Sequence, residues 1–149
     1  MNASIKSPTD HDVLSRHDLL ECSRMAASHA AEVLPQIYED NVNIAIWQRT
    51  HLPSFNRAID DLLAAHPGYT SSLMASPASA HQRVSDALPD GDLSALAEDI
   101  AELVDMFCCL FDLQRAGLRL AVLERAMCPR FHVDAVPCRL VTTYCGPTT

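Results

Sequence analysis

The sequence lacks any apolar run near the roughly 20 residues that a membrane-spanning helix needs. The N-terminal residues 1–12 also lack the apolar segment behind a basic start that marks a secretory signal. The four glycines are scattered, which excludes a glycine-rich phosphate loop. Six cysteines without a secretory signal are typical of reduced thiols, so we predict a cytoplasmic protein with no membrane partner.

Lysine is almost missing, because Lys6 is the only one and the other ten basic residues are arginines. The net charge is -8. We expect no nucleic-acid partner, since duplex binders carry a basic surface. Residues 86–112 contain eight acidic side chains and no basic one, whereas arginines dominate after residue 114. This asymmetry fits either a solvated acidic helix beside an arginine-bearing sheet or an anion site at Arg130 and Arg139.

The length of 149 residues suits one domain that can bury a core without disulfides. Hydrophobic residues make up 48% and charged residues 20%, which excludes a wholly disordered chain. Residues 1–17 are polar and predict a mobile tail. We therefore predict a single domain over residues 18–149.

Helical periodicity is clearest over residues 92–112, with Asp92 as the expected N-cap. The apolar positions on one stripe of this helix are Leu93, Leu96, Ile100, Leu103, Val104, Phe107 and Phe111. A second helix is predicted over 54–65, where Pro53 suits the first turn. A looser helical pattern covers 18–38 and is interrupted by Pro35.

Residues 70–91 are rich in Ser, Ala and Pro and predict a loop with a short helix near 81–88. Three β-like runs follow alternating or continuous apolar patterns, near 42–48, 117–126 and 138–145. The predicted fold is α+β, with a helix-rich N-terminal two-thirds packed on a small, antiparallel, incomplete sheet at the C-terminus. An incomplete sheet leaves an open edge, so we expect a homo-oligomer formed through that edge.

The densest chemistry lies between the last two predicted strands, at His132 and Asp134. In extended backbone, side chains two residues apart leave from the same face. An imidazole and a carboxylate on one face provide two of the three ligands of a two-His-one-carboxylate iron site. The same spacing also fits a simple His–Asp hydrogen bond at a strand end.

Cysteines surround this pair and favour zinc over iron, because thiolates and imidazoles are preferred zinc ligands. Cys128 and Cys138 are the candidates nearest to it, although no Cys-x-x-Cys pair occurs. Cys108 and Cys109 fall on the predicted buried helix and are expected to act as small core residues. Trp47 is expected to anchor its strand in the core.

Two stretches resemble a bacterial family known only as domain of unknown function 1826. One is Val42-Asn-Ile-Ala-Ile-Trp-Gln-Arg49, and the other is Cys128-Pro-Arg-Phe-His-Val-Asp134 running on to Arg139-Leu-Val-Thr-Thr-Tyr-Cys-Gly-Pro147. The resemblance implies a link to metal homeostasis. It also implies further strands after Pro147, so the chain is expected to be a truncated member. A His-x-Asp on a β-rich frame is similar to Fe(II)/2-oxoglutarate oxygenase barrels, at the level of fold only.

Two functions of different classes follow from these observations. The first is a metal-dependent enzyme of oxygenase type, with Fe(II) on His132 and Asp134 and with Arg130 or Arg139 holding the carboxylate of an unidentified small molecule. The second is a non-catalytic zinc-binding or metal-homeostasis protein that uses Cys128 and Cys138 besides that pair. A purely structural role for the motif is the third interpretation.

Overall fold

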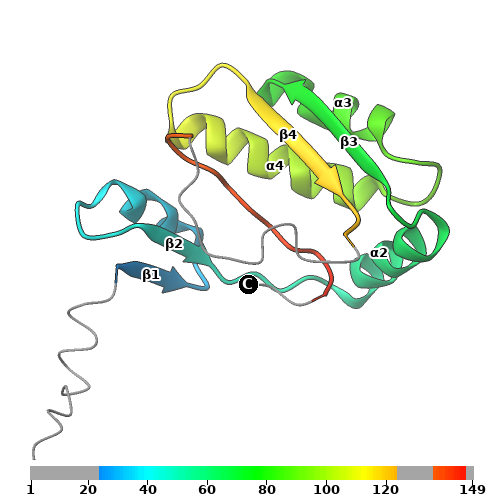
Figure 1. Ribbon diagram of the computed structural model, residues 1–149, viewed down its shortest axis with the longest axis horizontal. Coiled ribbons are helices and arrows are strands. Elements are labelled where there is room, and N and C mark those ends of the chain that lie inside the picture. Colours follow the sequence, from blue (N-terminus) through cyan, green and yellow to red (C-terminus); the bar gives the residue numbers. More distant parts are fainter. Residues whose placement is uncertain (1–23, 124–135, 147–149) are drawn as a thin grey trace, which may run out of the picture. The chain divides into compact units, whose positions relative to one another are not determined.

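The computed structural model describes residues 24–123 and 136–146 and shows an α+β protein, which confirms the predicted class. Figure 1 follows the chain from the blue N-terminal strand to the red C-terminal segment. The described residues form two compact units with a boundary between Arg49 and Thr50. The expected tail at 1–17 lies outside the described residues.

The first unit consists of two short strands and one 3₁₀-helix. β1 (Met25–Ser28) pairs in parallel with β2 (Ile44–Trp47), in the register Met25↔Ile44 to Ser28↔Trp47. The 3₁₀-helix η1 (Ala31–Tyr38) connects them and buries Val33. The Trp47 indole N–H donates a hydrogen bond to the carbonyl of His29 at 3.1 Å, which ties the end of β2 to the chain after β1.

The helix predicted over 18–38 is wrong for its described part. Residues 25–28 form β1, and only 31–38 are helical, with 3₁₀ geometry. Pro35 lies inside η1 and has no N–H to donate, so it cannot contribute the bond that an α-helix requires there. Parallel pairing with β2 supplies the backbone hydrogen bonds that outweigh the weak helical pattern upstream.

The strand predicted near 42–48 is present as β2, but its more buried face carries Ala45 and Trp47 rather than the two isoleucines. Ile44 and Ile46 are 56% and 37% exposed, whereas Ala45 and Trp47 are half-buried. Trp47 is therefore only partly the core anchor that was expected, and the Arg49 guanidinium lies 5.0 Å from its ring centre. The strand also pairs with β1 rather than joining the C-terminal sheet, since η1 brings its two flanking strands together.

The second unit begins with α2 (Pro53–Ala65), where Pro53 occupies the first turn as predicted. After it come β3 (Thr70–Ala75), the short 3₁₀-helix η2 (Pro77–Ser79), and α3 (Ala80–Ala87). The unit continues with α4 (Ser94–Leu110) and β4 (Ala116–Ala121). Figure 1 shows the sheet of β3 and β4 in front of α4, with α3 above and α2 beside them.

β3 and β4 form an antiparallel pair with the register Thr70↔Ala121 to Ala75↔Ala116. Their side chains alternate between two faces. Leu73, Ala75 and Leu118 lie on the face that packs against the hydrophobic core. Helices thus cover one face of the sheet, and on the other face Met74 and Arg119 are exposed.

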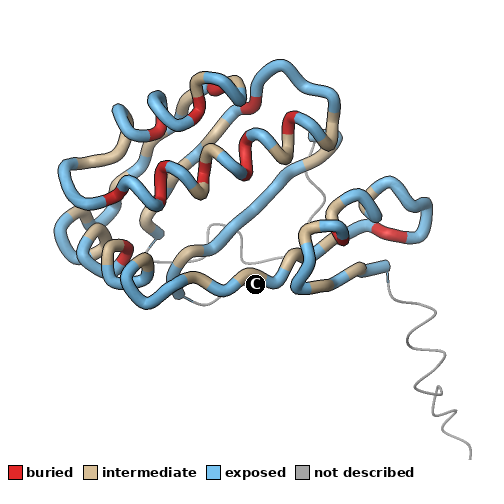
Figure 2. Tube along the Cα trace, turned by 180° about the vertical axis from the view of Figure 1, so that it is seen from behind, coloured by how far each residue is buried: buried red, intermediate tan, exposed pale blue. Residues whose placement is uncertain are grey.

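The core of this unit is built on α4, whose apolar stripe is buried as predicted. Figure 2 shows the buried positions recurring along one side of the helix. They are Leu96, Ala97, Ile100, Leu103, Val104 and Cys108. Val84 of α3 and Ile59 of α2 belong to the same core cluster as Ile100 and Val104. Burying each aliphatic side chain of this size contributes about 1.5–3 kcal/mol.

Several finer expectations about this unit are corrected. The loop predicted over 70–91 contains β3, although its helix near 81–88 is present as α3. β3 forms because Leu73 and Ala75 join the core and because the Tyr69 hydroxyl donates a 2.6 Å hydrogen bond to the carbonyl of Ala87. Sequence periodicity does not reveal such long-range contacts.

The start of α4 also differs from the expectation. The helix begins at Ser94, and its N-cap is the buried Leu93 rather than Asp92. Insertion of Leu93 into the core fixes the backbone there, and the Asp92 carboxylate instead accepts a 3.4 Å hydrogen bond from the Ser94 hydroxyl. Phe107 is half-buried, and Cys109 is exposed while Cys108 is buried.

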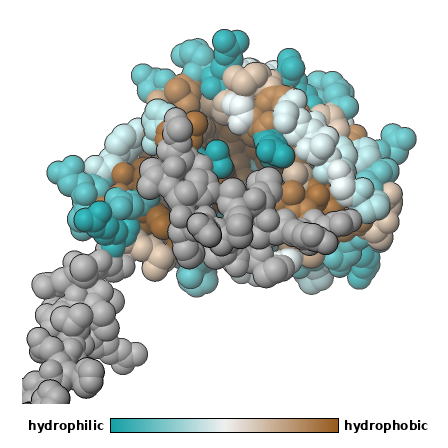
Figure 3. Space-filling model, viewed as in Figure 1, coloured by the Kyte–Doolittle hydropathy of each residue, from teal (hydrophilic) through white to brown (hydrophobic). Residues whose placement is uncertain are grey.

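The run predicted as a strand at 138–145 has no strand among the described residues 136–146. The predicted sheet of three strands is therefore replaced by the β1–β2 and β3–β4 pairs. Each described strand has one partner, and self-association through an open edge stays a prediction. The hydrophobic surface in Figure 3 is divided into separate patches among hydrophilic side chains.

None of the helices within 24–123 and 136–146 has both the length and the apolarity needed to cross a membrane.

The C-terminal end of α4 places a non-glycine residue in the left-handed region. Asp112 has φ of 50°, and Leu113 N–H donates a 2.8 Å hydrogen bond to the carbonyl of Cys108. This six-residue closure is the Schellman arrangement, in which glycine normally occupies the left-handed position. Asp112 therefore bears a conformational cost, and its carboxylate lies at the negative end of the helix dipole.

Replacing Asp112 with glycine is expected to raise the free energy of unfolding by about 0.5–1 kcal/mol, because the left-handed strain and the dipole repulsion are both removed. Urea denaturation followed by circular dichroism measures the change. Asp105→Gly is the matched control within the same helix and should destabilise by about 1 kcal/mol. A destabilised Asp112→Gly variant would contradict this account of the helix end.

Candidate functional site

The predicted metal and anion residues fall partly inside and partly outside the described part of the chain. His132, Asp134, Cys128 and Arg130 all lie outside the described residues. Cys138 and Arg139 are described, in the irregular segment 136–146. The predicted juxtaposition of imidazole and carboxylate therefore stays a prediction.

Cys138 is half-buried, whereas Arg139 is exposed. Burial raises the pKa of the Cys138 thiol above its ordinary value of 9.0, and a hydrogen bond from the backbone N–H of Arg139 acts in the opposite direction. The thiol is accordingly neutral at pH 7. A cation at the sulfur would displace this proton, because metals bind the thiolate.

The described end of the motif is attached to the helices of the second unit by Tyr144. The Tyr144 hydroxyl donates a 2.6 Å hydrogen bond to the Asp99 carboxylate on α4. Its ring centre lies 5.7 Å from those of Phe55 and His51, which themselves stack at 4.3 Å. We call these four residues the Tyr144 anchor.

Cys145 extends this attachment toward α2. Its thiol lies 3.8 Å from the Asp60 carboxylate, at the limit of a sulfur hydrogen bond. The Tyr144 anchor and this contact bring groups from α2, α4 and the C-terminal segment together. Sequence reasoning missed the anchor, because the separation of Tyr144 from Asp99 and from His51 leaves no local signal.

No group of three or more His, Cys, Asp or Glu side chains able to hold a metal occurs within residues 24–123 and 136–146. The predicted ligands His132, Asp134 and Cys128 lie outside that part of the chain.

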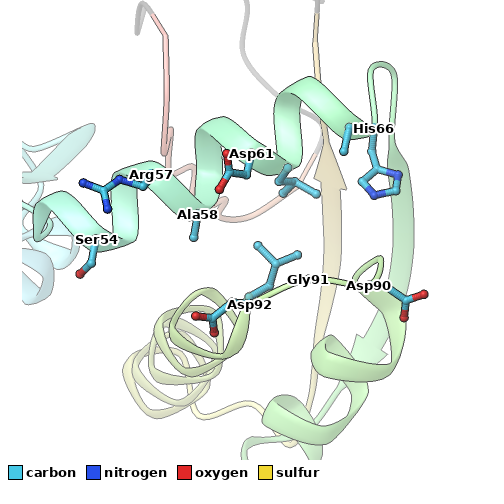
Figure 4. A pocket seen from close by; sticks show the side chains of 11 residues that line it. Ser54, Arg57, Ala58, Asp61, His66, Asp90, Gly91 and Asp92 are labelled. Carbon is cyan, nitrogen blue, oxygen red and sulfur yellow. The ribbon is translucent and has the colours of Figure 1, made fainter.

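A separate hollow lies between α2 and the turn at 90–93, which we call the α2 groove. Its volume is about 330 Å³. Figure 4 shows α2 above and the turn below, with Asp61, His66, Asp90 and Asp92 around the opening. No sequence pattern identified this hollow, since its two walls come from separate segments.

The neighbouring cysteines of α4 differ sharply in environment. Cys108 is buried, and desolvation, followed by the nearby Asp105 charge, raises the pKa of its thiol above 9.0. Cys109 is exposed. One helix therefore presents a protected thiol and an accessible one side by side.

Iodoacetamide at neutral pH is expected to modify Cys109 at least about tenfold faster than Cys108, because reaction requires an accessible thiolate. Peptide mass spectrometry over time gives both rates.

As pH rises through 9.0, the unfolded chain ionises Cys108 before the folded chain does, so unfolding becomes easier. In Cys108→Ala, this pH-dependent part of the loss in the free energy of unfolding should disappear. Equal alkylation rates at Cys108 and Cys109 would contradict the assigned burial.

A family model described as protein of unknown function (DUF1826) matches residues 28–149. The chain belongs to this family. The match includes β2 and the whole motif from Cys128 to Cys145, so the DUF1826 resemblance seen in the sequence is confirmed. No curated protein and no solved structure matches the chain.

Proposed function

We propose that this DUF1826 protein binds Zn²⁺ through His132, Asp134, Cys128 and Cys138, without catalysing a reaction. Nitrogen, oxygen and sulfur donors are the set that zinc takes in proteins. The supporting observation in the described residues is the environment of Cys138. Its half-buried sulfur accepts a hydrogen bond from the Arg139 backbone, which acts against the effect of burial and favours the thiolate that a metal binds.

The Tyr144 anchor supports the same proposal. It attaches the segment that contains Cys138 to α2 and α4, so the backbone near the sulfur is held by contacts six residues away. The four described cysteines are all free, which agrees with a reducing compartment. The proposal therefore locates the protein in the cytoplasm, where thiols remain available to a metal.

An Fe(II) oxygenase-like enzyme is the second candidate. The His132-x-Asp134 spacing favours it, since that pair supplies two ligands of a facial triad. Arg139 is exposed and carries the charge that would bind a carboxylate of the substrate. Cys138 as a further ligand would favour zinc instead, because soft thiolates are not part of that triad.

Metal analysis and affinity together test the proposal. Protein purified in reducing buffer without added metal is expected to contain about one zinc per chain, as one tetrahedral site requires. Competition with a chromogenic chelator should show zinc affinity lowered at least about tenfold by His132→Ala and by Cys138→Ser, since even residues beyond the ligands cost that much. His81→Ala and Cys109→Ser, which alter exposed residues, are the matched controls.

Unchanged zinc affinity in both variants would contradict the assigned ligands. The iron alternative is supported if anaerobic protein binds Fe(II) more tightly than Zn²⁺ and then consumes 2-oxoglutarate. Protein that binds neither metal above the level of the controls would leave the motif with a structural role.

A further inference from the structure

The α2 groove combines an apolar floor with a charged rim. The floor consists of Ala58, Leu62 and Leu93, which pack in or against the core cluster. Leu93 is buried and Leu62 is half-buried, so the floor is continuous with the core. A hydrocarbon group placed here would remove apolar surface from water on both sides, at about 25 cal/mol per Å².

The rim carries more negative than positive charge. Asp61, Asp90 and Asp92 provide three carboxylates, while Arg57 provides one guanidinium. Within the described part of the chain, Asp61 and Asp90 take no hydrogen bond or ion pair through their carboxylates. Both side chains are exposed, so a cation could reach them without breaking a contact within the described residues.

We propose that the α2 groove binds a small organic cation, an amine with a hydrocarbon body. The hydrocarbon lies on the floor and the ammonium contacts the Asp61 and Asp92 carboxylates, which come from opposite walls. The volume of about 330 Å³ is at the small end of ligand sites in proteins. The overall charge of -8 also attracts a cation rather than an anion.

The α2 groove shares no lining residue with the proposed zinc ligands. Its lining residues all fall between 54 and 93, whereas the ligands lie between 128 and 138. The amine proposal and the zinc proposal are therefore tested on different residues, and failure of one does not contradict the other. Since the rim is exposed, affinity is expected to be modest and to fall as salt is added.

Hexylamine is the probe, with hexanoate and ethylamine as matched comparisons. In an NMR titration of the full chain, hexylamine should shift amide signals of α2 and of residues 90–93. Hexanoate should leave them unchanged because its charge is reversed, and ethylamine should bind more weakly because its hydrocarbon is shorter. Asp61→Asn with Asp92→Asn should weaken hexylamine binding about fivefold, as expected for exposed ion pairs.

Asp105→Asn is the matched control, because it removes one exposed carboxylate from α4 outside the groove. It should leave hexylamine affinity unchanged, which separates local contact from general charge attraction. The proposal is overturned if hexanoate binds as well as hexylamine, if the double variant binds normally, or if the shifts map elsewhere. Absence of any saturable shift with hexylamine also overturns it.

Discussion

Replacing Ile100 with alanine is expected to lower the free energy of unfolding by about 2–5 kcal/mol. Ile100 is 4% exposed at the middle of the α4 stripe. It belongs to the core cluster that joins α2, α3, α4 and the sheet. Removing its outer carbons loses burial and leaves a cavity that the surrounding helices fill only in part. Since small domains are stable by only about 5–15 kcal/mol, this change is a large fraction of the total.

Urea denaturation followed by circular dichroism measures this loss for the second unit in the full chain. Glu98→Ala is the control, because Glu98 is exposed on the same helix and its change should stay within about 0.5 kcal/mol. A loss below about 1 kcal/mol for Ile100→Ala would show that α4 does not occupy the centre of the core.

Replacing Tyr144 with alanine is expected to cost about 2–3 kcal/mol, less than the 3–5 kcal/mol of a fully buried aromatic ring. The ring is half-buried beside Phe55 and His51, and its hydroxyl bonds the Asp99 carboxylate at 2.6 Å. Truncation removes both contacts and releases the C-terminal segment from α4. Proteolysis should then cut the segment 136–146 faster than in the unmodified chain.

Tyr144→Phe separates the two contributions, because it keeps the ring and removes the hydrogen bond. It should cost about 1 kcal/mol, the usual net value of a hydrogen bond. Urea denaturation of both variants gives the two losses, and limited proteolysis reports on the segment itself. If Tyr144→Ala is neutral and its proteolysis unchanged, the Tyr144 anchor does not hold the segment.

Local patterns predicted α2 and α4 well, and the reason is physical. The stripe through Leu96, Ile100 and Val104 repeats with the period of an α-helix, so its burial depends on few distant contacts. Pro53 likewise fixes the start of α2, because proline suits the first turn and no later one. The α+β class followed from the same periodicities.

The strands were harder to predict, because pairing depends on distant partners. β3 contains three consecutive polar residues, Thr70, Ser71 and Ser72, which have no apolar alternation. Its register with β4 and the burial of Ala75 supply the missing stabilisation. Conversely, 138–145 contains strand-forming residues, yet Tyr144 packs on the helices and no strand forms there among the described residues.

For the candidate site, the sequence allowed a prediction of the types of ligand but not of their arrangement in space. The residue types at 128–138 led to the prediction of a metal site, whereas which side chains meet depends on tertiary packing rather than on spacing. The Tyr144 anchor and the α2 groove each join segments that are far apart in the sequence, and tertiary packing creates them. No pattern within one segment carries that information.

The β3–β4 pairing has a consequence for how the chain folds. Its partner residues are roughly 40 to 50 positions apart, and α3 and α4 occupy the chain between them. Closing so long a loop is entropically unfavourable until the intervening helices have formed and docked. The two helices should therefore be structured early, and strand pairing should be a late step after the main barrier. β4 also emerges from the ribosome last of these elements. During synthesis, the backbone hydrogen-bonding groups of β3 therefore have no β4 partner, and other chains could pair with them.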